Sequence, residues 1–596
     1  MVMPAMPAPT MQTLVLVLPV SCGSSGTSAA IHTDVVWPES LCIQCCGRGL
    51  IGVVWRIGYA IWHFALGRNN DSEKNTMDKK VLDAAHAAFP KAENAVTLGA
   101  IVHDGEADPE PIVSIPIAMM NRHGLIAGAT GTGKTRTLQL IAEQLSQAGV
   151  PVFVADIKGD ISGLGAPGAS NDRITTRAKE TGFDWKPAAF PVEFLSLSGT
   201  HGAQLRATVS SFGPLLLSKV LGLNDTQASV MSLVFKFCDD KGLLLLDFSD
   251  LRAVLEYLTN DGADQLKSYG GMSKATVGVL LRDMVELEQQ GAQAFFGEPE
   301  FDIHDLMQQR DGKGLISILE LEDIQDKPAL FSTFMLWMLA TLYHELPEVG
   351  DIDKPKLVFF FDEAHLIFDD ASKALLDQIQ QVVRLIRSKG VGVFFITQSP
   401  KDINQDVLAQ LGHRVQHALR AFTPDDDKAL KAAARTFPKT PFYDVEETLT
   451  TLGIGEAFVT VLSPRGVPTP PFATRLIPPA STMGPLPDLD QRIASSQQVK
   501  KYATAIDRDS ARERLASRVS APPPQAAPAQ KQKEQSDWQP PPAPAPASRR
   551  GAQPPPSTFD SILKSPIARS AARTATTMIT RGILGAIMGK RSSSRW

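Results

Sequence analysis

The segment Gly128-Ala129-Thr130-Gly131-Thr132-Gly133-Lys134-Thr135 constrains this chain more than any other feature. It fits the pattern G-x-x-x-x-G-K-[ST] at every position. Residues 124–127 before it are typical of the end of a buried strand, and residues 137–145 after it carry apolar side chains at helical spacing. A loop between such a strand and helix surrounds phosphates with backbone N–H groups. The sequence therefore predicts a phosphate-binding loop (P-loop) for a nucleoside triphosphate.

Each residue type in this loop has an expected task. Lys134 should reach the β- and γ-phosphates of ATP, and the Thr135 hydroxyl should ligate Mg²⁺. The glycines let the backbone close around the phosphates. The alternative is an ordinary glycine-rich turn. The residues expected to bind the nucleotide are Gly128, Thr130, Gly131, Gly133, Lys134 and Thr135.

A second part of the predicted site lies far downstream, where an apolar run over residues 357–361 ends in Asp362 and Glu363. This pattern indicates a buried central strand with acids at its carboxyl end. Open α/β sheets bind ligands at those ends. We therefore expect Asp362 beside Mg²⁺ and Glu363 as the general base that activates water. The alternative is that the two acids only cap the following helix.

Two further apolar runs complete the predicted sheet. Residues 151–156 lead into the turn Asp156-Ile157-Lys158-Gly159-Asp160, and residues 391–396 lead into Thr397-Gln398-Ser399. An amide at the tip of a strand can hydrogen-bond the γ-phosphate or the attacking water. Gln398 is thus the candidate sensor of hydrolysis, and its alternative role is that of a turn residue.

Besides Lys134, the sequence shows no clear positive charge near the loop or the acidic strand. In ring ATPases a neighbouring subunit supplies an arginine to the γ-phosphate. We expect Arg414 or Arg420, on a strand predicted over 413–421, to act in this way. Alternatively, Arg420 pairs with an acid at 425–426.

Four segments together resemble the HerA/FtsK branch of P-loop ATPases, and within it the YjgR-like group. They are residues 121–128, 156–160, 361–365 and 384–398, and the resemblance extends over roughly residues 80–520 and to the basic tail. It implies a RecA-like α/β fold with a mainly parallel central sheet. It also implies an ATP- and Mg²⁺-dependent motor that forms a homo-hexameric ring and pulls DNA through a central pore.

The resemblance leaves the transported polymer open. An ATPase that moves or remodels a protein, as in secretion or conjugation, would share every motif. A small-molecule kinase has little use for Glu363, and a scaffold that does not hydrolyse ATP has little use for the complete set of site residues. HerA-type motors also carry a sizeable N-terminal β-barrel, whereas residues 94–116 suffice here only for a short hairpin. A nuclease-docking role is therefore not expected.

Charge and cysteine content narrow the partners and the compartment. The formal net charge of −5 excludes a uniformly basic surface, so nucleic-acid contacts must be local and independent of base sequence. Four basic residues next to the predicted sensor strand could contact phosphates, or they could simply form a solvated helix face. They are Arg384, Arg387, Lys389 and Lys401. The main domain holds one cysteine, Cys238, and is expected to be cytoplasmic.

The two ends differ in composition from the middle. Residues 1–76 are expected to be a non-native or disordered extension, although their apolar stretch at 50–66 leaves a membrane anchor as the alternative. The Cys42-x-x-Cys45-Cys46 cluster within them lacks a second ligand pair for zinc.

Residues 77–520 are expected to form the ATPase domain, with a helical insertion at about 200–310. A Pro/Ala-rich disordered linker should follow over 521–560. The basic tail at 561–596 is expected to form a short apolar-faced helix that would contact nucleic acid, an anionic membrane surface or a partner protein. A merely solvated tail is the alternative.

Overall fold

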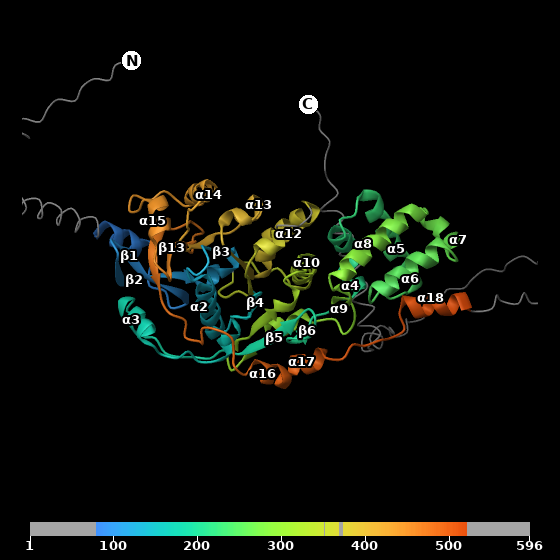
Figure 1. The fold of residues 1–596 in the computed structure, drawn as a ribbon, viewed down its shortest axis with the longest axis horizontal. Helices are drawn as coiled ribbons and strands as arrows, with labels where there is room; N and C mark the ends of the chain where they lie inside the picture. Colours follow the sequence, from blue (N-terminus) through green and yellow to red (C-terminus); the bar gives the residue numbers. More distant parts are fainter. Residues whose placement is uncertain (1–78, 351, 369–372, 521–596) are drawn as a thin grey trace, which may run out of the picture. The chain divides into compact units, whose positions relative to one another are not determined.

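The structure is a computed structural model that describes residues 79–520 apart from 351 and 369–372. The chain divides into two units, Met1–Lys79 and Lys80–Trp596, and the elements below all belong to the second (Figure 1). What the sequence predicts for residues 1–76 and for the linker and tail lies outside the described residues.

A twelve-stranded sheet organises the described part of the chain. In spatial order its strands are β2 (Glu106–Pro116), β1 (Ala95–His103), β14 (Phe472–Leu476), β13 (Glu456–Thr460), β12 (His413–Gln416), β3 (Gly124–Ala127), β11 (Val391–Thr397), β10 (Leu357–Phe361), β4 (Val152–Asp156), β9 (Ile316–Glu320), β5 (Val192–Ser196) and β6 (Ala203–Gln204). The strands from β12 to β6 are parallel, whereas those from β2 to β13 pair antiparallel. The expected mainly parallel α/β fold is thereby confirmed, and β1 with β2 forms the expected hairpin.

The parallel strands are covered on both faces, which explains their continuous apolar sequences. Every residue of β10 is buried. Because side chains alternate along a strand, Phe359 and Phe361 join one core while Val358 and Phe360 join the other. Helix α2 (Lys134–Gln147) contributes to the second core, and α10 (Pro328–Glu345) with α12 (Lys373–Ile386) contributes to the first. The central strands are thus held rigidly from both sides.

Helices α4 to α9 connect β6 to the later strands and pack into the same core as α10. Figure 1 shows them, in green, gathered beside the sheet. Their bounds are α4 (Val209–Val220), α5 (Asp225–Lys241), α6 (Phe248–Thr259), α7 (Ala263–Leu266), α8 (Lys274–Gln289) and α9 (Ala292–Phe295).

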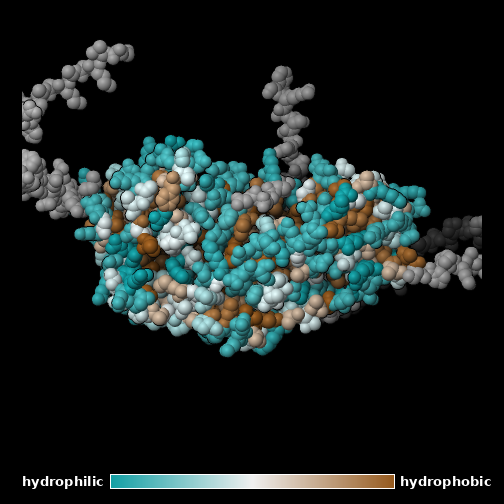
Figure 2. Space-filling view, viewed as in Figure 1, coloured by the Kyte–Doolittle hydropathy of each residue, from teal (hydrophilic) through white to brown (hydrophobic). Residues whose placement is uncertain are grey.

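Further helices lie around the sheet, namely α3 (Asp172–Glu180), α11 (His365–Phe368), α13 (Gln405–Leu408), α14 (Pro424–Ala434), α15 (Val445–Thr451), α16 (Leu489–Ser495) and α17 (Gln497–Tyr502). Helix α18 (Ala511–Ser520) packs against α6. Figure 2 shows apolar residues on the viewed face in patches separated by hydrophilic ones. Among the helices that the structure describes, none has both the length and the apolar character needed to cross a membrane.

The strand predicted over 413–421 is shorter than expected, because β12 ends at Gln416. Its parallel neighbour β3 ends at Ala127, where the P-loop begins. Beyond that point the chain bonds to the loop, and the amide of Ala129 donates to the carbonyl of Ala418 at 2.9 Å. Arg420 therefore lies outside the strand, and it is exposed.

Candidate nucleotide-binding and hydrolysis site

The P-loop joins β3 to α2 at the carboxyl edge of the sheet, the edge at which the parallel strands end. Gly128 has φ +152°, and a Cβ there would lie 2.5 Å from the Cβ of His417. Gly133 has φ +118° and immediately precedes α2. Only glycine adopts such conformations readily, so these two positions explain why the loop needs glycine. The loop is thus closely wrapped against β12, with its last turn at a helix N-terminus.

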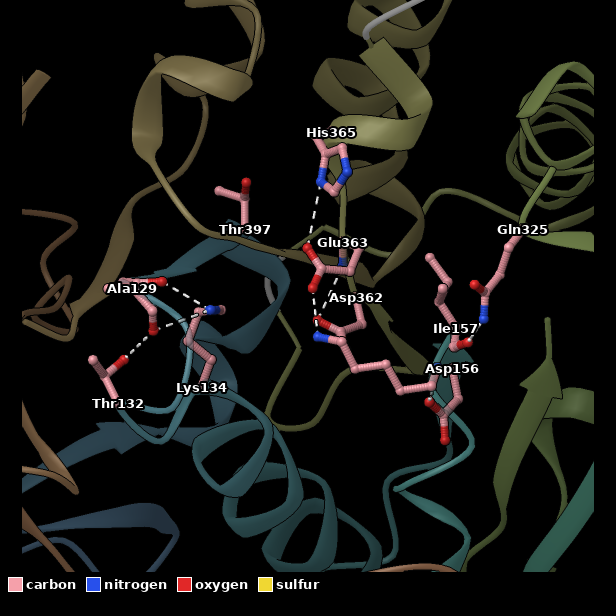
Figure 3. A network of polar contacts seen from close by, with 12 residues as sticks. Ala129, Thr132, Lys134, Asp156, Ile157, Gln325, Asp362, Glu363, His365 and Thr397 are labelled. Atoms are coloured by element: carbon pink, nitrogen blue, oxygen red, sulfur yellow. Dashed lines mark hydrogen bonds and ion pairs between the residues drawn. The ribbon is translucent and has the colours of Figure 1, made fainter. Parts of the chain in front are cut away.

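Lys134 is folded over the loop that it follows. Its Nζ donates to the carbonyls of Gly128 at 2.8 Å and Ala129 at 3.4 Å (Figure 3). Burial lowers the pKa of Lys134, and the charge of Glu363 acts in the opposite direction. An ammonium group that donates to the neutral carbonyls of the loop is well placed to move onto phosphate oxygens. Thr135 follows it in the first turn of α2.

Asp362 and Glu363 follow β10 at the same edge of the sheet. Both are buried, and the amide of Glu363 donates to Asp362 Oδ1 at 2.9 Å. Within the described residues, Asp362 Oδ2 is buried and has no hydrogen-bond partner. Burial raises the pKa of Asp362 to about 6. Because an unpartnered buried carboxylate oxygen is unfavourable, this atom fits the ligand of a divalent cation, with the Thr135 hydroxyl as the second protein ligand.

Glu363 is held in an unusual conformation between two basic side chains. Its φ of +45° lies in the left-handed region, which non-glycine residues adopt at a cost of about 1–3 kcal/mol, often at functional sites. Its Oε1 accepts from Lys158 Nζ, and its Oε2 lies 3.4 Å from His365 Nδ1. Burial acts to raise the pKa of Glu363, but the hydrogen bond and charge of Lys158 outweigh it and lower the pKa. The carboxylate is therefore ionised, as a general base requires.

Lys158 corrects the expectation that Lys134 is the only cation near the site. It lies in the turn that follows β4, and β4 is the direct neighbour of β10, with Ala155 opposite Phe361. The carboxylate of Asp156 fixes this turn by accepting from the amides of Lys158 at 3.1 Å, Gly159 at 3.0 Å and Ile161 at 2.9 Å. The turn, with its acids and its lysine at the end of an apolar strand, was visible in the sequence. What the sequence did not show is that this strand pairs with β10.

His417 is a second site residue that sequence reasoning missed. One ring nitrogen lies 2.8 Å from Thr137 Oγ1 on α2, and the other lies 2.9 Å from the carbonyl of Glu456. Since a carbonyl only accepts, Nδ1 carries the proton and Nε2 accepts from Thr137. Burial lowers the pKa of His417 to about 4. A neutral histidine thus ties β12 to the helix that follows the P-loop.

Gln398 lies directly beyond β11, the strand between β3 and β10 in the sheet. It is exposed, and it shares the carboxyl edge with the P-loop and Glu363. The strand end is fixed by its neighbour Thr397, which donates to Asp402 at 2.7 Å and accepts at its carbonyl from the amide of Gly128 at 3.2 Å. An exposed side chain at the carboxyl edge is in a position suited to the predicted sensor.

The expected arginines separate into two places. A pocket of about 580 Å³ at the amino edge, the opposite end of the parallel strands, is lined by Arg122, Arg384, Arg387 and Arg414, and none of its lining residues is acidic. Arg414 donates there to the carbonyl of Thr436 at 3.1 Å, and burial lowers its pKa. These arginines therefore lie away from the P-loop of their own chain.

Other members of the predicted basic set lie elsewhere. Arg420 follows β12 on the P-loop side, and the acids proposed to pair with it are engaged otherwise: Asp425 pairs with Lys428, and Asp426 caps α14. Lys401 is exposed in the turn after β11, at the carboxyl edge. Lys389 packs over the ring of Tyr343. The four basic residues expected to contact phosphate therefore do not form one continuous surface.

Comparison with known proteins shows the family to which the chain belongs. Residues 102–593 match the family model described as Helicase HerA-like C-terminal. The chain is 29% identical over 154 residues to the probable helicase MJECL08 of Methanocaldococcus jannaschii, a match that spans 24% of this chain and 28% of that curated relative.

Two solved structures are similar at lower identity. The bacterial conjugative coupling protein TrwB is 16% identical with a TM-score of 0.42, over 67% of this chain and 98% of that chain. VirB4 of Thermoanaerobacter pseudethanolicus is 14% identical with a TM-score of 0.41, over 65% of this chain and 97% of that chain. Similarity at this level does not indicate what this chain moves.

Proposed function

The chain belongs to the Helicase HerA-like C-terminal family of P-loop ATPases, and on that premise we propose that it is an ATP-hydrolysing motor that translocates DNA. The observation that supports ATP hydrolysis is the convergence of a complete P-loop with two buried acids at one edge of a parallel sheet, and DNA as the polymer is proposed from the helicase description of the family. One acid has an unpartnered oxygen suited to a cation, and the other is held ionised for proton transfer. Binding alone would not need the second.

In the proposed reaction, Lys134 holds the β- and γ-phosphates, and Thr135 and Asp362 would hold Mg²⁺, which would neutralise charge at the phosphate oxygens. Glu363 takes a proton from water, whose oxygen bonds to the γ-phosphorus as the bond to the leaving ADP oxygen breaks. Gln398 orients that water and reports the loss of the γ-phosphate to the strand behind it.

The transported polymer is tested by stimulation of ATP hydrolysis. We expect single- or double-stranded DNA to raise the rate several-fold, independently of base sequence, and the effect to weaken as salt rises because phosphate contacts release counterions. A Lys134→Ala protein serves as the inactive control. Stimulation by an unfolded polypeptide but not by DNA would replace the DNA motor with a secretion- or conjugation-type ATPase, the alternative that the shared motifs leave open.

We further propose a homo-oligomeric ring, a hexamer, in which an arginine acts on the nucleotide of the next subunit. The amino-edge pocket supports this arrangement, since Arg414 lies among three other arginines and away from its own P-loop. Arg420, near its own loop, is the second candidate. Mixing Arg414→Ala protein with Lys134→Ala protein should restore ATPase activity, because the second supplies the arginine that the first lacks.

The matched control for this mixing experiment is a Lys134→Ala, Arg414→Ala double variant, which should not restore activity. Restoration by the double variant would refute Arg414 as the residue acting in trans, and the same pair of experiments with Arg420→Ala would then test the second candidate. Normal activity of a purified monomer would refute the ring.

We also propose a cytoplasmic location, because the domain has few cysteines. The motif set supports membership of the YjgR-like subgroup. The changes in composition at the two ends support the boundaries 77–520 for the ATPase domain.

A further inference from the structure

The proposed mechanism assigns no task to Lys158, although its ammonium group binds the carboxylate of the proposed base. We propose that Lys158 senses the γ-phosphate: it binds Glu363 when the site holds no triphosphate, and it moves to a γ-phosphate oxygen when ATP is bound. The inference rests on the proposed ATPase function and extends it with a second cation supplied by the same chain.

The first argument is how the charges of the site are paired. Lys134 donates to loop carbonyls, and Lys158 occupies Oε1 of Glu363. Both ammonium groups are therefore held on protein oxygens at the place where a triphosphate would bring strong negative charge. The two lysines and the two acids also lie close enough to influence one another electrostatically.

The second argument is the difference in mobility between the partners. The turn that carries Lys158 is fixed by three hydrogen bonds to Asp156, and a Cβ on the adjacent Gly159 would meet Glu322 Oε1 at 2.2 Å. Glu363 is also rigid, with 9% of its side chain exposed. The side chain of Lys158 is 44% exposed. The ammonium group can thus change partners while the backbone on both sides stays in place.

The third argument is chemical. While Lys158 occupies Oε1, that carboxylate oxygen is blocked from accepting the proton of an attacking water. Transfer of the ammonium group to the γ-phosphate removes the block and places positive charge where the transition state gathers negative charge. The same movement frees Oε1 of Glu363 when a γ-phosphate is present. ADP, which lacks that phosphate, leaves the lysine on Glu363.

The test compares affinities for ATP and ADP. In the Lys158→Met protein, we expect the Kd of a non-hydrolysable ATP analogue with Mg²⁺ to rise about tenfold, the Kd of ADP with Mg²⁺ to change less than twofold, and kcat to fall about 10²-fold. The Lys158→Arg protein keeps the charge and should keep the preference for the triphosphate. Lys186→Ala is the matched control, since the Lys186 side chain is 78% exposed and pairs with its neighbour Asp184.

A second measurement separates sensing from a merely structural role. Replacing Glu363 by Gln weakens the resting partner of Lys158, so Glu363→Gln protein should bind the ATP analogue several-fold more tightly than the wild type. That gain should vanish in a Lys158→Met, Glu363→Gln double variant. ADP affinity should be the same in all of these proteins.

Equal weakening of ATP analogue and ADP binding in Lys158→Met, or a loss of kcat with the triphosphate preference unchanged, would overturn the inference and leave the ATPase function standing. A wild-type chain that neither binds nor hydrolyses ATP would instead refute the proposed function. Should Lys158→Met fail to fold, the ratio of ATP-analogue affinity to ADP affinity is measured in Lys158→Arg and Glu363→Gln. A ratio in Glu363→Gln that equals the wild-type ratio overturns the inference.

Discussion

Replacing Glu363 by Gln tests whether this carboxylate is the general base. The amide has nearly the same shape and can still accept from Lys158, but it cannot take a proton from water. Loss of a general base slows turnover by about 10²-fold or more, which corresponds to about 2.7 kcal/mol of transition-state stabilisation. Nucleotide binding should be retained, because the P-loop and Asp362 are unchanged.

The structure also limits the effect of this substitution on folding. The variant exchanges the ion pair with Lys158 for a neutral hydrogen bond. Since the Lys158 side chain is 44% exposed, solvent screens that pair, and we expect a change of less than about 1 kcal/mol in the free energy of unfolding. A large loss of activity beside a small loss of stability would therefore mark a catalytic defect.

Three measurements carry the test: titration with a fluorescent ATP analogue, phosphate release at saturating ATP, and thermal unfolding. Lys134→Ala is the comparison, since removing its ammonium group should abolish tight ATP binding. The two variants must differ in binding. Equal loss of nucleotide affinity in both, or a Glu363→Gln protein with wild-type turnover, would refute the role assigned to Glu363.

Three further predictions concern the loop, the core and the domain boundaries. Gly128→Ala should weaken ATP binding at least tenfold and lower the free energy of unfolding by about 1–3 kcal/mol, because the added Cβ would lie 2.5 Å from the Cβ of His417. Gly105→Ala, at a position with open space around it, should retain ATP binding. Equal affinities of the two variants in calorimetric titration would contradict this prediction. Burial lowers the pKa of His413 to about 4, so its neutral form contributes stability above about pH 6.5 that is lost as the pH falls toward 4. In urea unfolding, the His413→Gln protein should lose less stability than the wild type over that range, by up to about 1.4 kcal/mol per pH unit. Identical pH profiles for the two proteins would contradict the assignment. A chain of residues 77–520 should fold and hydrolyse ATP as the full chain does, and its aggregation beside a stable full-length protein would refute the boundaries.

Much of the parallel sheet could be predicted from the sequence, because its central strands are short apolar runs that end in polar residues. The runs at 151–156, 357–361 and 391–396 correspond to β4, β10 and β11 within a residue or so. Burial on both faces demands such sequences, so they are recognisable without any neighbour. The length of β12 was not recognisable, since apolar residues continue to Ala421 although the neighbour that β12 pairs with stops at Ala127.

The residues of the site divide along the same line. The P-loop, Asp362 and Glu363 are fixed by contiguous motifs, because the chemistry of phosphate and Mg²⁺ requires particular residues at particular spacings. Lys158 and His417 follow no such pattern. Lys158 meets Glu363 across 205 residues and His417 meets Thr137 across 280, so their roles depend on which strands become neighbours.

The sequence by itself therefore determined the nucleotide chemistry of this protein and the class of its fold, since both are written in local patterns of residue type. Only the tertiary structure decided the order of the strands. That order places β4 beside β10, which brings Lys158 to the base, and it gathers four arginines at the amino edge rather than near the P-loop. The physical reason is that strand order follows from the packing of distant segments around two cores, and no local stretch of sequence records which distant segment will lie beside it.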